Sequence, residues 1–513
     1  MRVLLVSTYE LGHQPLHLAT PAAALRRAGH EVRTVDLHER PWGAADDASL
    51  GWAELLAVSV PMHTAMRLAV PLLRRARERQ PDLVVCLYGL YATLADSADL
   101  AGVADVALAG EYLDGLVELA AGSARSQVRA PGGSSHGGSS HGGSSPPTPP
   151  SGALSTAASS SDAGGSGRPA SEPAVRVELG RRRPGLVPDR QGLANLGAYA
   201  RLSTRDGEHL AGYVEATTGC AERCRHCPVP VVYAGRVRRV PVDDVVADVE
   251  SLVALGARHV TFGDPDFLNV PRHAERVVDA VHGAFPEVTF DVTAKVTHLL
   301  RHDDLVARWA HQGLAFVVSA LETTDDAVLA LLGKGHTRAD ASRAVDLLAG
   351  HGVTVRPSWL PFTPWTTAAS VVDLLRFTAA HGLVPATDPV QYSIRLLVPP
   401  GSLLLELPEA RRRLDGYDPN RLSWTWSAAD HRLDALQSRL AARAEEAGRA
   451  ASGPAEVWPE ICDLVADALD EPAVRELRGA GAAGVPAPGL TEPWFCCAEP
   501  TEGQLGCVAG QPA

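Results

Sequence analysis

The sequence predicts an α/β protein: a doubly wound parallel sheet, then a partial (β/α)6 barrel, then a helical C-terminal region. Short apolar runs alternate with amphipathic segments over residues 1–121, and the same alternation resumes over residues 175–400. Gly, Ser and Pro dominate the stretch between them. With 513 residues, 45% of them hydrophobic, the chain is long enough for two or three packed domains.

Residues 1–121 carry the first alternation. The expected strands are MRVLLVS, HEVRTVD, LLAVSV, PDLVVCLYG and ADVALAG, and the helices between them include PAAALRRAG and AVPLLRRARER. Continuous apolar strands that alternate with helices indicate a parallel sheet covered on both faces. The length fits a five-stranded, flavodoxin-like sheet.

Residues 122–174 are predicted to be a disordered linker. Their Gly, Ser and Pro content cannot bury enough apolar surface to offset the entropy of ordering the chain. His136 and His141 recur in a GGSSH repeat, which could bind a stray metal ion, but the composition favours a solvated spacer.

Residues 175–400 repeat strand and helix signals at the pitch of β/α units, which predicts a closed or nearly closed barrel. Six strands are expected: GYVEATTG, RHVTFGDPDF, VTFDVTAKV, LAFVVSALET, VTVRPSWLPF and PVQYSIRLLV. Residues 401–485 are predicted to be helical, and the Cys-containing tail at 486–513 has no hydrophobic period.

Composition limits the function classes. A net charge of -13 argues against a general nucleic-acid-binding surface and favours small-molecule or protein partners. No signal-peptide pattern and no run of about 18 apolar residues occurs, so we expect a cytoplasmic protein without a membrane segment. Eight cysteines are too few for a disulfide scaffold, so clustered thiols point to metal binding or chemistry.

Three of these cysteines lie close together after the first expected barrel strand. Cys220, Cys224 and Cys227 have the spacing C-x3-C-x2-C, and residues at the carboxyl ends of barrel strands face the ligand-binding mouth. Three thiolates suit a 4Fe-4S cluster that leaves one iron open for another ligand. The alternatives are zinc with a fourth ligand such as His226, and a purely structural loop.

This motif and its placement resemble the radical S-adenosylmethionine (SAM) superfamily over residues 181–398. The resemblance implies an enzyme that uses a 4Fe-4S cluster to cleave SAM, and a 5'-deoxyadenosyl radical that abstracts hydrogen from a substrate. It also implies a reductant such as ferredoxin or flavodoxin. The substrate, a small molecule or peptide, is not specified, and methylation, methylthiolation and natural-product modification all fit.

The resemblance also assigns cofactor-binding residues. Gly263, Asp264 and Pro265 occupy the second-strand position that grips the SAM amino group. Ser319 and Glu322 occupy the fourth-strand position that contacts the ribose or the carboxylate. His226 stands where the superfamily usually has an aromatic residue that precedes the third cysteine, and adenine contacts are expected around Val355 and Leu396.

Four further charged or titratable residues lie in the barrel sequence. Lys295 and Arg395, on expected strands, either bind a carboxylate or phosphate or form a salt bridge within the barrel. Lys334 and His336, in LLGKGHT, are expected on a solvated loop rather than in catalysis.

The N-terminal unit is similar to the cobalamin-binding domains that precede many radical SAM barrels. The loop YELGHQPLHLAT contains His13 and His17 but lacks the Asp-x-His-x-x-Gly motif that supplies a cobalt ligand. Two alternatives stay open: cobalamin held without a protein imidazole, with its tail near Ser59 and Gly89, or a domain that serves only as a scaffold.

The C-terminal PWFCCAEP resembles the signature of the CUAEP/CCAEP-tail radical SAM group, some members of which carry selenocysteine where this chain has Cys497. Exchange of selenocysteine and cysteine suits a soft nucleophile or redox centre, so Cys496 and Cys497 are candidate catalytic residues, with Cys507 as a further thiol. The alternative is a disordered tail whose cysteines have no role. Cys86 and Cys462 are expected to be packed thiols.

The sequence leaves two alternatives to a radical SAM enzyme that modifies a small molecule or peptide. One is a non-catalytic iron-sulfur or zinc protein with a regulatory role. The other is a transfer-RNA modifier, suggested by the basic residues 181–183 and opposed by the acidic composition.

Overall fold

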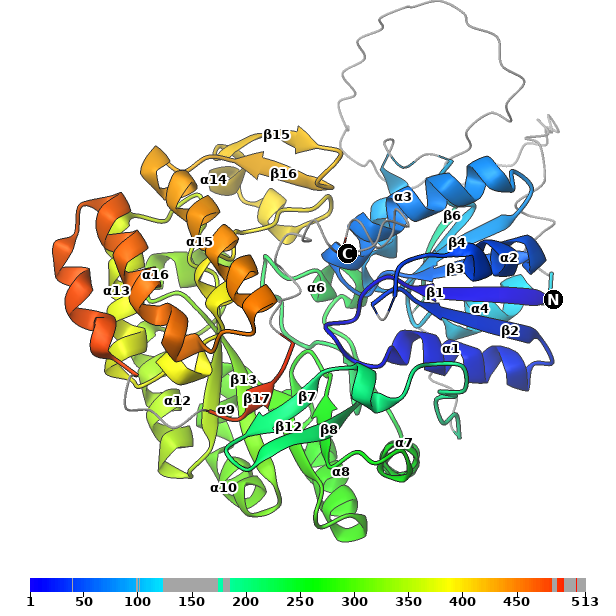
Figure 1. Ribbon diagram of the computed structural model, residues 1–513, viewed down its shortest axis with the longest axis horizontal. Helices are drawn as coiled ribbons and strands as arrows, with labels where there is room; N and C mark the ends of the chain where they lie inside the picture. Colours follow the sequence, from blue (N-terminus) through cyan, green and yellow to red (C-terminus); the bar gives the residue numbers. More distant parts are fainter. Residues whose placement is uncertain are drawn as a thin grey trace, which may run out of the picture.

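The structure is a computed structural model that describes residues 1–38, 40–97, 100, 102–122, 174–178, 185–481, 487–492 and 504. Figure 1 shows two α/β units side by side, the N-terminal sheet in blue and cyan and the barrel in green and yellow. Most of the expected linker, the basic residues 181–183 and all three tail cysteines lie outside the described residues. No helix in the described ranges is long and apolar enough to cross a membrane.

The N-terminal unit is built on a parallel sheet. Within the described residues its strands run in the order β2-β1-β3-β4-β5-β6. They are β1 (Arg2–Ser7), β2 (Glu31–Asp36), β3 (Leu55–Ser59), β4 (Val84–Tyr88), β5 (Val106–Gly110) and β6 (Ala174–Glu178). The first five have the flavodoxin-like order that the sequence predicts. The sixth pairs with β5 in parallel, so this sheet recruits residues that the sequence placed at the linker end and in the barrel unit.

Alternate residues of β1 enter different cores, which is why helices cover both faces of this sheet. Leu4 and Val6 face one cluster, and Val3 and Leu5 face the other. The covering elements are α1 (Leu16–Arg27), α2 (Ala44–Trp52), α3 (His63–Arg79), η1 (Leu90–Asp96) and α4 (Leu113–Ala120). The expected doubly wound arrangement is confirmed.

The second unit contains five parallel strands in the order β14-β13-β12-β11-β8, extended beyond β8 by antiparallel strands β7 and β17. The parallel strands are β8 (Gly207–Val214), β11 (His259–Phe262), β12 (Thr289–Thr293), β13 (Leu314–Glu322) and β14 (Thr354–Trp359); the edge strands are β7 (Arg201–Thr204) and β17 (Gly489–Leu490). The first five predicted barrel strands are therefore confirmed.

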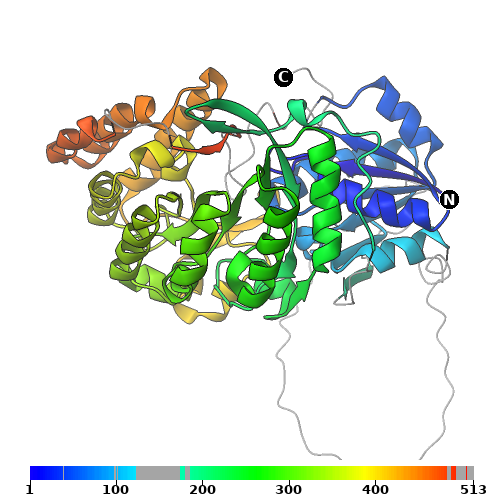
Figure 2. The ribbon, with the colours of Figure 1, turned by 90° about the horizontal axis from the view of Figure 1, so that it is seen from below.

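Helices lie along the outside of this sheet (Figure 2). They are α7 (Val242–Ala254), α8 (Pro271–Ala284), α9 (Val296–Arg301), α10 (Asp303–His311), α11 (Asp326–Leu332), α12 (Arg338–Gly350) and α13 (Ala368–Ala380). After β8, the chain forms a small hairpin of β9 (Thr217–Gly219) and β10 (Val237–Arg239), which encloses helix α6 (Val229–Tyr233).

The predicted sixth barrel strand is wrong. The 3-10 helix η6 (Pro389–Tyr392) occupies its first half, and only a parallel bridge between Phe362 and Arg395 continues the sheet. Pro389 has no N–H to donate to a ladder, and the Ser393 hydroxyl donates to the Val390 carbonyl, which favours a turn.

The C-terminal region packs on the barrel core through residues such as Leu436 and Trp458. Its helices are α14 (Pro408–Arg411), α15 (His431–Ala450) and α16 (Pro454–Leu469), followed by η8 (Pro472–Gly479). A hairpin of β15 (Leu414–Asp418) and β16 (Ser423–Trp426) interrupts this helical region and was not predicted.

Candidate active site

The carboxyl ends of both sheets face one cavity of about 450 Å³. The N-terminal unit lines it with residues that follow its strands: Glu10 and His17 after β1, Met62 after β3, Gly89 after β4, and Glu111 and Tyr112 after β5. The barrel lines it with Glu215 after β8, Gly263 and Pro265 after β11, Glu322 at the end of β13, and Trp359 at the end of β14. In parallel α/β sheets, this edge is where ligands bind.

The cysteine loop, residues 220–227, connects β9 to α6 at the rim of this cavity. Gly219 starts it with φ +79°, and a Cβ there would lie 2.3 Å from the Arg236 carbonyl oxygen, so only glycine fits. Cys220 and Cys224 are buried, and the half-buried Cys227 lines the cavity. The structure thus places the last cysteine at the position from which a bound group can reach the cavity.

Asn269 fixes the beginning of the loop. Its side-chain carbonyl accepts from the Ala221 N–H at 3.0 Å, and its amide nitrogen lies 3.5 Å from the Cys220 sulfur. Asn269 follows β11 in the same stretch as Gly263, but sequence reasoning did not single it out. A signal was available: a polar side chain just after a barrel strand faces the mouth.

Helix α11 fixes the end of the loop. The Arg225 N–H donates to the Leu332 carbonyl at 2.8 Å, and its guanidinium donates to the Ala330 and Leu331 carbonyls at 3.1 and 2.9 Å. These carbonyls belong to the last turn of the helix, where the regular intrahelical bonds end, although Ala330 also accepts from the Gly333 N–H. The loop between Cys224 and Cys227 is therefore held by the end of a barrel helix.

Beside this anchor lies a buried ionic cluster. Lys334 Nζ lies 2.9 Å from Glu322 Oε1, and His226 Nε2 lies 3.1 Å from the same oxygen. Burial acts to raise the pKa of Glu322, but Lys334 and His226 outweigh it and hold that pKa well below its usual range. Lys334 and His336 are 3% and 5% exposed, so the expectation of a solvated loop is wrong. The ion pair to Glu322 compensates the charge of the buried Lys334.

The predicted second-strand residues divide into two roles. Gly263 and Pro265 line the cavity. Asp264 points away into the core, where it accepts from the Ala216 N–H at 2.8 Å and from the Thr217 hydroxyl at 2.5 Å. Burial raises the pKa of Asp264 to about 7. Asp264 therefore holds the strand that leads into the cysteine loop.

Tyr213 was missed by sequence reasoning. Its hydroxyl lies 3.4 Å from the Gly263 carbonyl oxygen, and a Cβ on Gly263 would lie 1.9 Å from that hydroxyl. Gly263 is thus required for the close approach of a cavity-lining phenol.

The fourth-strand residues also differ. Glu322 lines the cavity and has φ +63° at a register shift between β13 and β14. Ser319 is 1% exposed, lies outside the cavity lining, and donates its hydroxyl to the Ala294 carbonyl at 2.8 Å. Of the adenine candidates, Leu396 lines the cavity and Val355 is packed in the barrel core.

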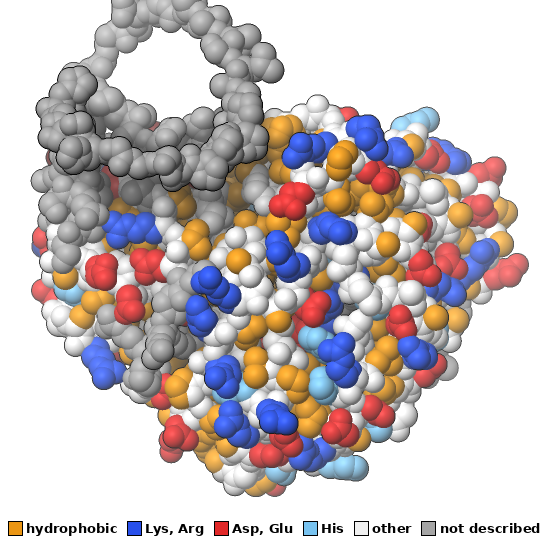
Figure 3. Space-filling view, turned by 180° about the vertical axis from the view of Figure 1, so that it is seen from behind, with side chains coloured by type: hydrophobic (Ala, Val, Ile, Leu, Met, Phe, Trp, Pro, Cys, Tyr) orange, Lys and Arg blue, Asp and Glu red, His pale blue; other side chains and the backbone are white. Residues whose placement is uncertain are grey.

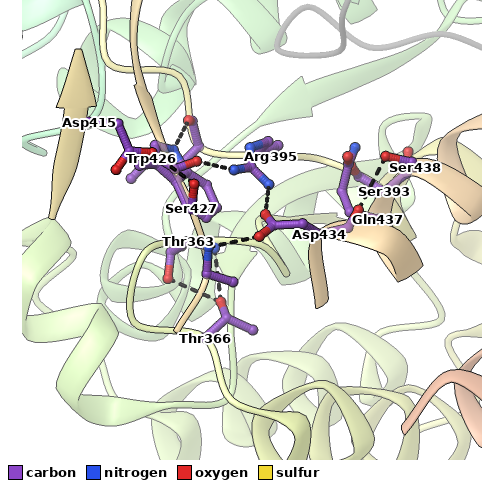
Figure 4. A network of polar contacts seen from close by, with 12 residues as sticks. Thr363, Thr366, Ser393, Arg395, Asp415, Trp426, Ser427, Asp434, Gln437 and Ser438 are labelled. Carbon is purple, nitrogen blue, oxygen red and sulfur yellow. Dashed lines mark hydrogen bonds and ion pairs between the residues drawn. The ribbon is translucent and has the colours of Figure 1, made fainter. Parts of the chain in front are cut away.

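Lys295 and Arg395 both form salt bridges. Lys295 Nζ lies 2.5 Å from Glu222 of the cysteine loop, which agrees with a salt bridge within the barrel. Arg395 lies 2.6 Å from Asp434 of α15 in the C-terminal region, donates to the Trp426 carbonyl, and stacks 3.6 Å above the Trp426 ring centroid (Figure 4). Arg395 also lines the cavity.

The two histidines of the first loop are engaged within the protein. His17 Nδ1 lies 3.0 Å from Glu10 and Nε2 lies 3.6 Å from Glu215, while buried His13 packs against Tyr213 with ring centroids 4.5 Å apart. Burial lowers the pKa of His13 to about 4. These residues do not fit a cobalamin held through a histidine of this loop.

The two residues expected near a cobalamin tail differ, because Gly89 lines the cavity and Ser59 lies outside the cavity lining. Ser59 is fully buried with its hydroxyl 3.5 Å from Glu10, and a Cβ on Gly89 would lie 3.1 Å from the Val60 backbone.

The three thiols fit an iron-sulfur cluster. Burial raises the pKa of Cys227 to about 12 and also raises the pKa of Cys220, so this environment needs a cation to favour thiolates. In the described part of the chain, no group of three His, Cys, Asp or Glu side chains lies close enough to hold one metal ion. In a 4Fe-4S cluster each thiolate binds a different iron, so the three sulfurs need not meet at one atom.

Comparison with known proteins identifies the barrel. Residues 214–374 match the family model of the radical SAM superfamily. The barrel is a radical SAM domain. This superfamily uses a 4Fe-4S cluster and SAM, the two cofactors that the sequence resemblance implied. Nothing in the comparisons bears on the CUAEP/CCAEP-tail group or on the tail cysteines.

Curated relatives of the radical SAM domain are methylthiotransferases. The ribosomal protein uS12 methylthiotransferase RimO of Nitratiruptor sp. is 28% identical over 96 residues, 18% of this chain and 22% of the relative. The tRNA-2-methylthio-N(6)-dimethylallyladenosine synthase of Alkalilimnicola ehrlichii is 24% identical over 270 residues, 50% of this chain and 59% of the relative. The matches therefore span less than two thirds of each relative.

Solved structures share the fold over more of the chain. The radical SAM methyltransferase TsrM from Kitasatospora setae, with tryptophan and a SAM analog bound, has a TM-score of 0.54 at 18% identity and covers 79% of this chain and 74% of its own. The cobalamin-dependent radical SAM enzyme OxsB has a TM-score of 0.59 at 13% identity and covers 85% of this chain and 65% of its own. At these identities the likeness shows the fold alone.

Proposed function

We propose that this chain is a radical SAM enzyme that holds a 4Fe-4S cluster through Cys220, Cys224 and Cys227 and modifies a small molecule or peptide. The single observation that carries the proposal is that this C-x3-C-x2-C loop lies in the radical SAM domain, at the rim of the cavity that the carboxyl ends of both sheets face. The reduced thiols that it requires suit the cytoplasm.

When bound, the cluster supplies the electron that cleaves SAM and yields a 5'-deoxyadenosyl radical; a one-electron donor such as ferredoxin or flavodoxin provides that electron. The protein's own contribution is positioning and exclusion of water, because such a radical reacts with any neighbour. Gly263, Pro265 and Glu322 line the same cavity as Cys227 and are the proposed SAM contacts, with His226 3.1 Å from Glu322. Asp264 supports the cysteine loop by accepting a hydrogen bond from the Ala216 N–H, in the segment that leads into the loop.

The wall contributed by the N-terminal unit is proposed to select the substrate. Tyr112 and Met62 supply apolar surface, and Glu10, Glu111 and His17 supply polar groups. Small-molecule sites commonly combine such a largely apolar lining with a few polar groups. A nucleic-acid substrate is less favoured, since the net charge is -13 and Figure 3 shows both charge signs interspersed over the face drawn.

We further propose that Cys496 and Cys497, in the tail that resembles the CUAEP/CCAEP-tail group, act at this cavity. The described residues just before them support the idea. Strand β17 pairs with β7, and Glu492 accepts a hydrogen bond from the Tyr9 hydroxyl at 3.1 Å, next to cavity-lining Glu10. Cys496 follows Glu492 by four residues, a reach of about 14 Å for extended chain.

Anaerobic reconstitution tests the central proposal. We expect wild-type protein to take up about four irons per chain, to absorb broadly in the visible range and, once reduced, to convert SAM to 5'-deoxyadenosine. Alanine at Cys220, Cys224 and Cys227 together should abolish iron uptake and SAM cleavage. C462A, which alters a buried thiol of α16, is the matched control and should retain both.

Two results would contradict the proposal: a wild-type preparation that takes up zinc and no iron, or unchanged SAM cleavage in the triple variant. Adding hydroxocobalamin to the same preparation, followed by gel filtration, distinguishes the two alternatives for the N-terminal unit. Cobalamin that elutes with the protein indicates a cobalamin-binding domain, and cobalamin that elutes separately indicates a scaffold.

A further inference from the structure

Lys334 is a buried cation beside the cysteine loop, reached by a turn that only a few residue types can make. Helix α11 ends at Leu332, and Gly333 follows in the left-handed region with φ +68°. The Lys334 N–H then donates to the Leu329 carbonyl at 3.1 Å. This turn sends the side chain inward, where the residue is 3% exposed.

Its ammonium contacts one carboxylate, which in turn contacts His226 of the cysteine loop. Glu322 Oε1 lies 2.9 Å away, and the charges of Cys224 and Cys227 act on it as well. Burial acts to lower the pKa of Lys334, but Glu322 and the two cysteines outweigh it, so the side chain stays charged. His226 shares the same Glu322 oxygen at 3.1 Å.

The position of Lys334 relative to the loop is rigidly set. Arg225, between Cys224 and Cys227, is bound to three carbonyls of the α11 end, at Ala330, Leu331 and Leu332. The helix end that presents Lys334 is thus the same one that holds the loop. A cation at a fixed place in a dry environment acts strongly on neighbouring charge, since water does not screen it.

A purely structural ion pair accounts poorly for this arrangement. Exchange of a buried pair for apolar side chains is often neutral or stabilising, so stability alone does not require Lys334 and Glu322. A role for the charge itself explains why a lysine is buried next to two cysteines of the loop.

We propose that Lys334 is a positioning residue for the cluster: its ammonium stabilises the one-electron-reduced cluster and thereby raises the cluster's reduction potential. This inference rests on the proposed function, because it needs a cluster at Cys220, Cys224 and Cys227. The reduction adds one electron, and one negative charge, from an external low-potential donor. Glu322 partly neutralises Lys334, so it limits the rise.

The test is a redox titration of the full-length, reconstituted protein without SAM, followed by electron paramagnetic resonance, with iron and sulfide measured per chain. K334M should keep its iron and shift the midpoint potential downward, whereas K334R should match wild type. E322Q should shift the potential upward, because it leaves the lysine charge without its carboxylate partner. R223M removes an exposed charge from the same loop and should shift it far less.

A K334M protein with wild-type iron content and wild-type potential would overturn the inference. If K334M fails to hold its cluster, the direction of the shift in midpoint potential for E322Q decides. An E322Q potential equal to or below that of wild type also overturns the inference. Absence of iron from the wild-type protein is a different outcome, and it contradicts the proposed function rather than the role of Lys334.

Discussion

Asp264 gives the most direct quantitative prediction, because its carboxyl group is buried and ties the entrance of the cysteine loop to β11. Burial raises the pKa of this group from 3.8 to about 7, and the hydrogen bonds from Thr217 and Ala216 act against that rise. One pH unit corresponds to about 1.4 kcal/mol, so ionising Asp264 costs about 4 kcal/mol more in the folded protein than in the unfolded chain.

The direction of the pH effect follows. Below about pH 4, Asp264 is protonated in both states and contributes no pH dependence. Between about pH 4 and pH 7, the unfolded chain has released the proton that the folded protein keeps, so rising pH favours unfolding. Above about pH 7, the whole cost is present. Asp264 therefore destabilises the barrel progressively as pH rises through this window.

Asp264→Asn removes the ionisation while keeping an acceptor for the Ala216 N–H. We expect D264N to gain stability relative to wild type between pH 5 and pH 8, by up to about 3 kcal/mol of the 4 kcal/mol available. Urea unfolding of the full chain at both pH values, followed by the fluorescence of buried tryptophans such as Trp309, measures the change. The constant offset from the new amide cancels in this difference. If the D264N and wild-type curves keep the same separation at both pH values, the reasoning fails.

Three other variants test the loop and the tail. G219A should lower the free energy of unfolding by about 1–3 kcal/mol and reduce iron uptake, because its Cβ meets a carbonyl at positive φ. The control G416A, whose Cβ has no neighbour within 4 Å, should behave as wild type. Equal iron uptake by G219A and wild type would contradict this prediction. R225A should lose iron faster than the exposed-site control R223A under a chelator, since it removes both guanidinium bonds to α11 and keeps only the backbone one. Equal rates would mean that the side-chain bonds do not anchor the loop. C497S should keep SAM cleavage but lose turnover on the substrate; unchanged turnover, read by mass spectrometry of the product, would dispose of its catalytic role.

The strands and the cysteine loop could be predicted because their signals are local. Apolar runs with β-branched residues mark β1 and β11 wherever they pack, and C-x3-C-x2-C is read from eight consecutive residues. The same local logic failed at residues 389–398, where an apolar run looks like a strand but Pro389 and the Ser393 side chain favour a 3-10 turn.

Burial of Lys334 could not be predicted from the stretch LLGKGHT, because the residues that compensate its charge lie in other parts of the sequence. A short stretch with two glycines and a lysine is typical of a surface loop. The partner that compensates its charge, Glu322, is twelve residues away at the end of a barrel strand, and the loop that it faces lies about a hundred residues upstream. Pairing of β6 with β5 is likewise nonlocal, since the whole Gly, Ser and Pro segment separates the two strands.

The two units are joined at the point where the chemistry would begin. Thr218, two residues before Cys220, donates its hydroxyl to Glu111 of the N-terminal unit at 2.5 Å, and His17 lies between Glu10 of that unit and Glu215 of the barrel. The polar anchors of the cysteine loop, Asn269 and the end of α11, belong to the barrel, whereas Cys220 and Cys227 pack in the same hydrophobic cluster as the N-terminal unit. Changes at polar wall residues outside this cluster, such as Glu10, should therefore alter which molecule fits the cavity before they alter iron binding.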